Sequence, residues 1–147
     1  MTERTVFQSM AQRHVVSVLP TANVYTAACV MTRNNSSSLL VIDGASTMLG
    51  IVTERDLMAR VLAKALDPMV ATVADIMTRG PQCVTPETKV SDAVLIMIER
   101  GFRHLPVVTG DTNKIMGVFS VRDALPREVQ NAVSLAEFNE QVNDALG

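Results

Sequence analysis

The sequence predicts an α+β fold made of two β-α-β-β-α units that are related by a pseudo-two-fold axis, with a short helix at each end of the chain. The main observation is a repeat, because residues 18–56 match residues 84–123 at an offset of 66 that becomes 67 beyond the middle. Each copy also contains two short apolar runs joined by a Gly-containing loop, as in a β-hairpin. The hydrophobic fraction of 48% supports a dense core. Because one such unit is small for a domain, we expect the two to pack on each other and form two related clefts.

The first unit and the segment before it show one predicted element after another. Residues 2–12 carry a short amphipathic stripe, which predicts an N-terminal helix. Val24, Ala27 and Met31 recur at the spacing of one helix face. The remaining elements are a strand at 15–19, a hairpin of strands at 39–42 and 48–53, and a helix at 57–65.

A linker and a second unit follow in the same order. Thr72 and Asp75 have the spacing of a capping box and predict a short linker helix. The second unit then predicts a strand near 83–85, a helix at 90–100 that Gly101 ends, strands at 105–108 and 115–120, and a helix from Val121 that Pro126 kinks or truncates.

The C-terminal segment predicts a further helix. Ser134 and Glu137 repeat the capping-box spacing, and Leu135, Phe138 and Val142 form an apolar stripe that must pack on the chain itself or on a partner subunit. We therefore divide the single module 1–147 into a first repeat at 13–66, a linker at 67–82, a second repeat at 83–128 and a C-terminal helix at 129–147.

Composition and charge exclude several classes of protein. The net charge of −2 argues against a basic face for nucleic acid. No apolar run reaches the roughly 18 residues that a membrane span needs, and no signal-peptide segment follows the start, so we expect a cytoplasmic protein without membrane contact. Cys29 and Cys83 have no second Cys or His at metal-ligand spacing, which predicts reduced core cysteines and no metal site.

The residue pattern with functional potential recurs where the last strand of each unit ends. Thr53 and Ser120 are each followed three residues later by an aspartate, Asp56 or Asp123. One interpretation is structural, because the hydroxyl and the carboxylate can cap the next helix. The other is functional, because a helix start can hold a phosphate while a carboxylate binds the two hydroxyls of a ribose. The recurrence of the pattern favours function.

A second candidate segment lies at 101–108. Arg103 and His104 precede the strand that pairs with the Ser120 strand, so we expect both side chains near the same cleft. There they can contact an anionic phosphate. For His104 the alternative is an ordinary surface or core hydrogen bond.

The order and spacing of these motifs resemble a tandem pair of cystathionine-β-synthase (CBS) domains, the Bateman module. The resemblance covers residues 15–127 and rests on GFRHLPVV and GVFSVRD in one copy and on LLVID and GIVTERD in the other. It implies a regulatory, non-catalytic module that senses an adenosine-containing nucleotide in the clefts between the repeats. AMP, ADP, ATP, NAD-type ligands and S-adenosylmethionine all remain open, and no other cofactor is required.

The resemblance also implies a role for individual residues. Asp123 corresponds to the ribose-binding aspartate, and Ser120 to the hydroxyl residue beside phosphate and ribose. Arg103 and His104 correspond to the pair that meets the phosphates. The full set implied is Val84, Thr85, Arg103, His104, Pro106, Ser120, Arg122 and Asp123 in the second repeat, with Thr53 and Asp56 in the first; the backbone of Val84 and Thr85 is expected to meet the adenine.

The first repeat departs from this pattern. Residues 36–38 are three serines where the second repeat has Phe-Arg-His, and Leu40 replaces Pro106. The loss of positive charge predicts that an anionic ligand prefers the second cleft.

Three functions compete at this stage. The favoured one is the nucleotide-sensing module, acting as a homodimer on an unidentified regulated protein. The alternative is a structural dimerisation module whose clefts are vestigial. An enzyme is disfavoured, because the chain has no phosphate-binding G-x-x-x-x-G-K-[ST] loop, no metal cluster and no recognisable nucleophile-base pattern.

Overall fold

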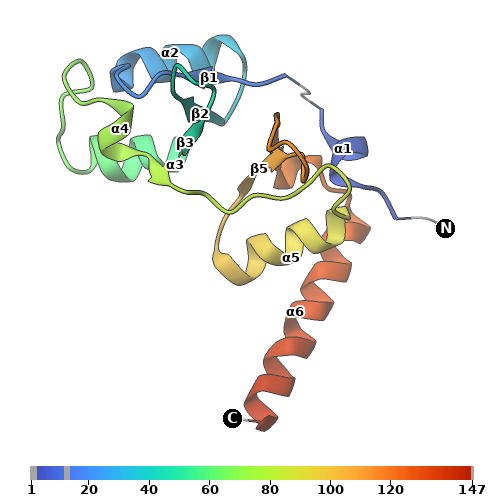
Figure 1. Cartoon of the computed structure of the whole chain (residues 1–147). Coiled ribbons are helices and arrows are strands. Elements are labelled where there is room, and N and C mark those ends of the chain that lie inside the picture. Colours follow the sequence, from blue (N-terminus) through green and yellow to red (C-terminus); the bar gives the residue numbers. More distant parts are fainter. Residues whose placement is uncertain (1–2, 12–13, 147) are drawn as a thin grey trace. The chain divides into compact units, whose positions relative to one another are not determined.

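The computed structural model describes residues 3–11 and 14–146 of the chain. They form two compact units (Figure 1). The repeat-1 unit is the continuous stretch 14–82, and the repeat-2 unit joins the N-terminal segment to the chain from Cys83 onwards. The predicted α+β class with two repeats and a C-terminal helix is confirmed.

The repeat-1 unit is a four-stranded sheet with helices packed on it. In chain order its elements are β1 (Ser17–Val18), α2 (Val24–Arg33), β2 (Ser38–Ile42), β3 (Met48–Thr53), α3 (Glu54–Asp56), a π-helical continuation η1 (Leu57–Leu62), α4 (Val73–Ile76) and β4 (Thr78–Arg79). The sheet order is β1-β2-β3-β4, with β1 parallel to β2 and the other pairs antiparallel. Gly50 lets β4 approach β3, because a Cβ there would lie 2.6 Å from the Thr78 carbonyl oxygen.

The repeat-2 unit has the same plan with a smaller sheet. Its elements are α1 (Val6–Ser9), α5 (Val90–Arg100), β5 (His104–Val108), β6 (Ile115–Ser120), a single 3₁₀ turn η2 (Val121–Asp123) and α6 (Pro126–Leu146). Gly101 ends α5 in the left-handed conformation, with φ of 77°, as the sequence predicts. The strand expected near 83–85 is reduced to one parallel bridge, Val84 to Val107.

The two hairpins share one register. Ser38 pairs with Thr53 and His104 with Ser120, and the irregularity in each ladder follows Val41 or Val107. The loop between the strands has five residues, 43–47, in the first hairpin and six, 109–114, in the second. The change in repeat offset is therefore one extra loop residue, which leaves the strand ends aligned.

The repeat extends further than the matched segments suggest, and its two extra pieces are exchanged. Thr5 caps α1 and Thr72 caps α4, each through a capping box. Helix α1 precedes the first repeat in the chain, yet its Val6 is buried in the core of the repeat-2 unit. Helix α4 precedes the second repeat, yet its Val73 is buried in the core of the repeat-1 unit.

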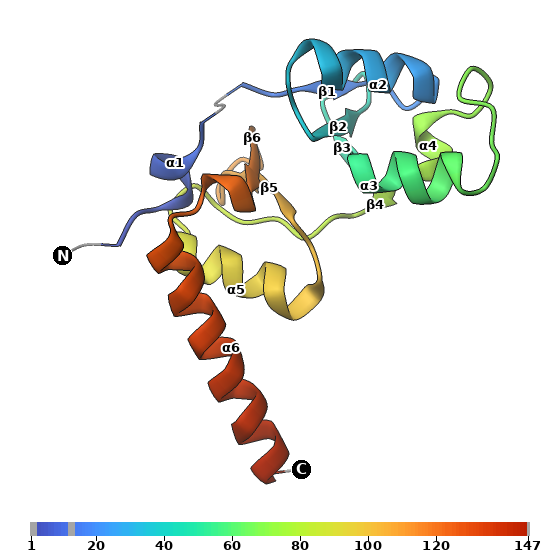
Figure 2. The same ribbon diagram turned by 180° about the vertical axis from the view of Figure 1, so that it is seen from behind.

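The C-terminal helix begins earlier than predicted. Helix α6 is continuous from Pro126 to Leu146, so Ser134 lies inside it and does not cap a new helix. Pro126 neither kinks nor shortens this helix but occupies its first position, where the missing N–H costs nothing. The predicted helix from Val121 is only the η2 turn, because Ala124 is extended, with ψ of 146°. Figures 1 and 2 show α6 running along α5 and continuing past it.

Candidate functional site

The predicted hydroxyl–aspartate pattern forms the same turn in both repeats. After β6, the Ser120 N–H donates to Asp123 Oδ2 at 3.0 Å, and the Ser120 hydroxyl accepts from the Arg122 N–H at 3.3 Å. After β3, the Thr53 N–H donates to Asp56 Oδ2 at 2.9 Å, and the Thr53 hydroxyl accepts from the Asp56 N–H at 3.4 Å. The hydroxyl and the aspartate therefore cap the turn at both sites, and any ligand has to bind to a turn whose internal hydrogen bonds are already formed.

The two aspartates differ in what else holds them. Asp56 is 9% exposed, and its Oδ1 lies 3.5 Å from Arg60 Nε. Arg60 also donates to the carbonyl oxygens of Ile76 and Met77 at 3.1 and 3.2 Å, so its position is fixed. Asp123 is half-buried, and in the described part of the chain its carboxylate accepts only the Ser120 N–H. One carboxylate oxygen of Asp123 is thus available to a ligand.

This difference follows from the path of the backbone after each turn. In the repeat-1 unit the helix continues from Asp56 through η1, which brings Arg60 one turn along to face the carboxylate. In the repeat-2 unit the chain becomes extended at Ala124 before α6 begins. Arg127, which corresponds to Arg60, is therefore not one helical turn from Asp123, and no hydrogen bond or ion pair joins the two side chains among the described residues.

The predicted phosphate pair lies beside the Asp123 turn. His104 is the first residue of β5 and is paired in register with Ser120. The carbonyl oxygen of Arg103 accepts from the Val121 N–H at 3.2 Å, which joins the two segments. The Arg103 side chain is exposed and makes no hydrogen bond or ion pair within residues 3–11 and 14–146. Arg103, His104 and Asp123 therefore all lie at one end of the β5–β6 hairpin.

The residues expected to face an adenine lie farther along β5. The Val84 N–H donates to the Pro106 carbonyl oxygen at 2.9 Å, and the Val84 carbonyl accepts from Val108 at 2.9 Å. The Thr85 N–H donates to the Thr88 hydroxyl at 3.1 Å. Val107, the partner of Val84, is about 10 Å from His104 at the usual strand rise. The N–H groups of Val84 and Thr85 are thus already used, and Val84 and Pro106 are both buried, so a base can meet this segment mainly through backbone carbonyl lone pairs.

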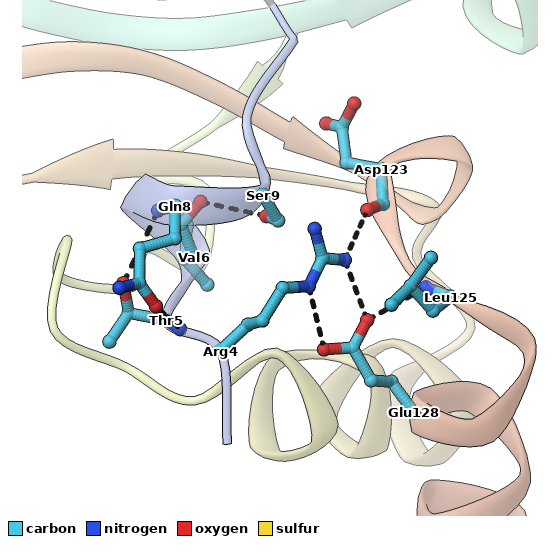
Figure 3. Close-up of polar contacts among 8 residues, drawn as sticks. All are labelled: Arg4, Thr5, Val6, Gln8, Ser9, Asp123, Leu125 and Glu128. Atoms are coloured by element: carbon cyan, nitrogen blue, oxygen red, sulfur yellow. Dashed lines mark hydrogen bonds and ion pairs between the residues drawn. The ribbon is translucent and has the colours of Figure 1, made fainter. Parts of the chain in front are cut away.

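An ion pair that the sequence did not reveal adjoins this site (Figure 3). Arg4 grips Glu128 with two nitrogens, Nη2 to Oε1 at 2.7 Å and Nε to Oε2 at 3.1 Å. Its Nη2 also donates to the backbone carbonyl of Asp123 at 3.0 Å. The hydrogen bond from Arg4 lowers the pKa of Glu128, and the same bond raises the pKa of Arg4. The signal that was missed is the alignment of Thr5-Val6 with Thr72-Val73, which places the N-terminal segment within the repeat.

Neither a cluster of metal-ligating residues nor a membrane-spanning helix is present in the described part of the chain. No group of three or more His, Cys, Asp or Glu residues there is placed to hold a metal ion. Within the same residues, no helix combines the length and apolar character needed to cross a membrane.

Comparison with known proteins matches both repeats. The model of the CBS domain family matches residues 7–63 and 73–128. The chain is 36% identical over 119 residues to an uncharacterised 17.7 kDa protein of Acidianus ambivalens, covering 81% of this chain and 70% of that one. It is also 32% identical over 131 residues to the Meiotically up-regulated gene 70 protein of Schizosaccharomyces pombe. That alignment covers 84% of this chain but only 18% of the relative.

A solved structure shares the same fold. The CBS domain protein from Pyrobaculum aerophilum, which is complexed with AMP, superimposes with a TM-score of 0.77 at 24% identity. The match covers 90% of this chain and 99% of that one.

Proposed function

Because the chain belongs to the CBS domain family, we propose that it is a regulatory module that binds an adenosine nucleotide and has no catalytic activity of its own. One observation carries the proposal: the Asp123 carboxylate keeps an oxygen available at the same end of the β5–β6 hairpin that carries the exposed Arg103. A ribose needs an acceptor for its two hydroxyls, and a phosphate needs a cation. The AMP complex of the Pyrobaculum aerophilum protein supports the choice of ligand class.

The proposed ligand lies along β5 in the repeat-2 unit. Asp123 and Ser120 take the ribose, and Arg103 and His104 take the phosphates. The base lies against Val84, Thr85 and Pro106. Arg122, which is exposed and next to Asp123, adds positive charge at the mouth of the site. AMP, ADP, ATP and NAD-type ligands all present this combination of base, ribose and phosphate.

The corresponding site of the repeat-1 unit is proposed to be weaker. Asp56 is engaged by Arg60, so a ribose would have to displace an ion pair before it could bind. Residues 36–38 bring no charge to this end of the hairpin. Thr53 and Asp56 therefore act first as a helix cap and only second as ligand-binding residues.

The module is proposed to act as a homodimer that regulates another protein in the cytoplasm. Leu135, Phe138 and Val142 of α6 are all exposed, as is Ile98 of α5, so helix faces of the repeat-2 unit offer apolar surface to a second copy. The division into repeats at 13–66 and 83–128 with a linker at 67–82 stays part of this proposal, while the C-terminal helix expected at 129–147 begins at Pro126.

Calorimetric titration of the purified chain with AMP, ADP, ATP, NAD and S-adenosylmethionine tests the function. Saturable binding of at least one of them, with adenosine binding more weakly than AMP, is the expected result. Absence of heat and of competition for any of the five ligands at millimolar concentration contradicts it. That outcome favours the alternative, a structural dimerisation module with vestigial clefts.

A further inference from the structure

We propose that Arg4 is a positioning residue of the ligand site in the repeat-2 unit, although it lies 119 residues before Asp123 in the chain. The inference rests on the proposed function, since it concerns the turn that carries Ser120 and Asp123. It adds a contribution from the N-terminal segment, which lies outside the part of the chain that carries every predicted ligand contact of this repeat.

Arg4 holds the turn at two points (Figure 3). Its Nη2 donates directly to the Asp123 carbonyl at 3.0 Å. Its second grip is indirect, because the Glu128 carboxylate that it binds accepts from the Leu125 N–H at 2.7 Å. Glu128 is only 5% exposed, so water competes little for these bonds. We call this arrangement of Arg4, Glu128, Asp123 and Leu125 the N-terminal clasp.

The clasp holds the backbone carbonyl of Asp123 and makes no hydrogen bond to its carboxylate. In Figure 3 the Asp123 carboxylate points away from the guanidinium, while the Asp123 carbonyl faces it. The Asp123 carbonyl lies in the planar peptide group that follows its Cα, so holding the carbonyl orients that Cα. The carboxylate is attached to the same Cα and is oriented with it. A carboxylate that must meet two ribose hydroxyls at once benefits from this preorganisation, because less freedom is lost on binding.

The clasp is not needed to build the fold, because the repeat-1 unit lacks it. The backbone contact is conserved between the repeats: the Val90 N–H donates to the Arg4 carbonyl at 3.0 Å, and the Val24 N–H to the Ala71 carbonyl at 2.9 Å. Ala71 therefore takes the place of Arg4. At the offset of 67 that relates Asp56 to Asp123, Val61 takes the place of Glu128. Both replacements pack in the apolar core of that unit.

The two repeats thus hold their turns in opposite ways. In the repeat-1 unit Arg60 forms an ion pair with the Asp56 carboxylate, and the positions that correspond to Arg4 and Glu128 hold apolar residues. In the repeat-2 unit the arginine comes from the N-terminal segment and occupies the aspartate carbonyl. Only the second arrangement both fixes the turn and leaves the carboxylate to a ligand. By linkage, a ligand that favours the fixed turn also favours docking of residues 3–11.

The test variant copies the repeat-1 residues into the repeat-2 unit. Arg4→Ala/Glu128→Val removes the whole clasp and leaves no buried charge without a partner. The matched control is Lys89→Ala, which removes the exposed ion pair between Lys89 and Glu3 at 3.3 Å on the same N-terminal segment. Arg4→Lys, which keeps the charge but loses the fork, serves as a milder variant if the double variant fails to fold.

Two measurements are made on each variant of the full chain. The first is amide exchange followed by NMR without ligand. In the double variant the Ala124 N–H, which donates to the Val121 carbonyl at 3.2 Å and contacts neither deleted side chain, should exchange at least tenfold faster, while Phe119 in β6 stays protected. The second is calorimetric titration with AMP, where the double variant should bind about tenfold more weakly and Lys89→Ala should match the wild type.

Each other outcome overturns the inference. Unchanged exchange at Ala124 means that Arg4 does not fix the turn. Faster exchange with unchanged AMP affinity means that the clasp is structural only. An equal loss of affinity in Lys89→Ala means that any loosening of the segment has the same effect. If the wild type binds no AMP, the proposed function fails as well, whereas the exchange measurement still decides whether Arg4 positions the turn.

Discussion

The Nε atom of Arg60 lies 3.5 Å from the Asp56 carboxylate, one helical turn after it, and this contact makes the two halves of the molecule inequivalent. An aspartate already paired with a cation is a poor partner for a neutral ribose, because binding must first break the pair. The corresponding Asp123 has no cation on its carboxylate within the described chain. The predictions below start from this asymmetry.

Removal of the proposed ribose acceptor should weaken nucleotide binding. Asp123→Ala leaves two hydroxyls of a bound ribose without a charged acceptor, which costs about 1.5–3 kcal/mol. That is about one to two decades in Kd by calorimetry. Asp56→Ala is the matched change and should have the smaller effect. A 2′,3′-dideoxy ligand should lose affinity for the wild type and little more for Asp123→Ala; equal binding of ribo and dideoxy ligands to the wild type excludes the role.

The charge beside the turn should matter for phosphate and not for nucleoside. Arg103→Ala should weaken AMP more than adenosine, because only AMP loses a charge-assisted contact. AMP affinity should also fall as salt rises, since Arg103 is exposed. Paired titrations of AMP and adenosine into wild type and variant measure the difference. A change of equal size for both ligands, or for neither, removes Arg103 from the phosphate site.

The buried end of the clasp gives a pH-dependent contribution to stability. The pKa of Glu128 is lowered from its ordinary value of 4.5, chiefly by the hydrogen bond from Arg4. A carboxyl whose pKa is lower in the folded state stabilises the fold above its unfolded pKa and loses that contribution as pH falls. Glu128→Gln should therefore reduce the free energy of unfolding by about 1–3 kcal/mol at pH 7. In urea titrations the gap between wild type and variant should narrow as pH drops below about 4.5. A gap that stays constant down to pH 3 contradicts the assignment.

The exchanged helices predict a crossed pattern of destabilisation. Val6→Ala and Val73→Ala each remove about two buried methyl groups, at roughly 2 kcal/mol including the cavity. Although Val6 precedes the first repeat, its loss should raise amide exchange in the β5–β6 hairpin. The loss of Val73, which precedes the second repeat, should raise it in β2 and β3. If Val6→Ala instead raises amide exchange in β2 and β3, or Val73→Ala raises it in the β5–β6 hairpin, then α1 and α4 are not swapped between the two repeats.

A homodimer should depend on the apolar stripe of α6. Phe138 is 59% exposed, and a charge there would be buried at any interface that this stripe forms. Phe138→Glu should shift the chain from dimer to monomer in light scattering at micromolar concentration. Asn143→Glu adds the same charge elsewhere on α6 and should leave the dimer intact. A wild type that is monomeric with and without nucleotide refutes the assembly itself.

The sequence predicted those elements whose pattern is local. The bounds expected for α5, β3 and β6 are confirmed, because helical spacing and a Gly cap define α5 and each strand is a short apolar run that follows a Gly-containing hairpin loop. Helix α6 was placed wrongly, since Ser134 looks like a cap although the helix already runs through it. The N-terminal clasp could not be predicted from the sequence, because Arg4 and Glu128 are 124 residues apart. The repeat gives no hint either, since the corresponding residues Ala71 and Val61 differ from them in charge and size.

The repeat-2 unit is completed by segments that lie on both sides of residues 14–82 in the chain. Residues 14–82 can complete their own core while synthesis continues, because every strand and helix of that unit lies within this stretch. Val6 and Met10, by contrast, belong to a cluster whose other members lie between Val84 and Ala132, so their core partners are synthesised only after the repeat-1 unit. A nascent chain in which residues 14–82 are complete therefore still lacks the core partners of its N-terminal apolar side chains, a condition under which exposed apolar surface favours association.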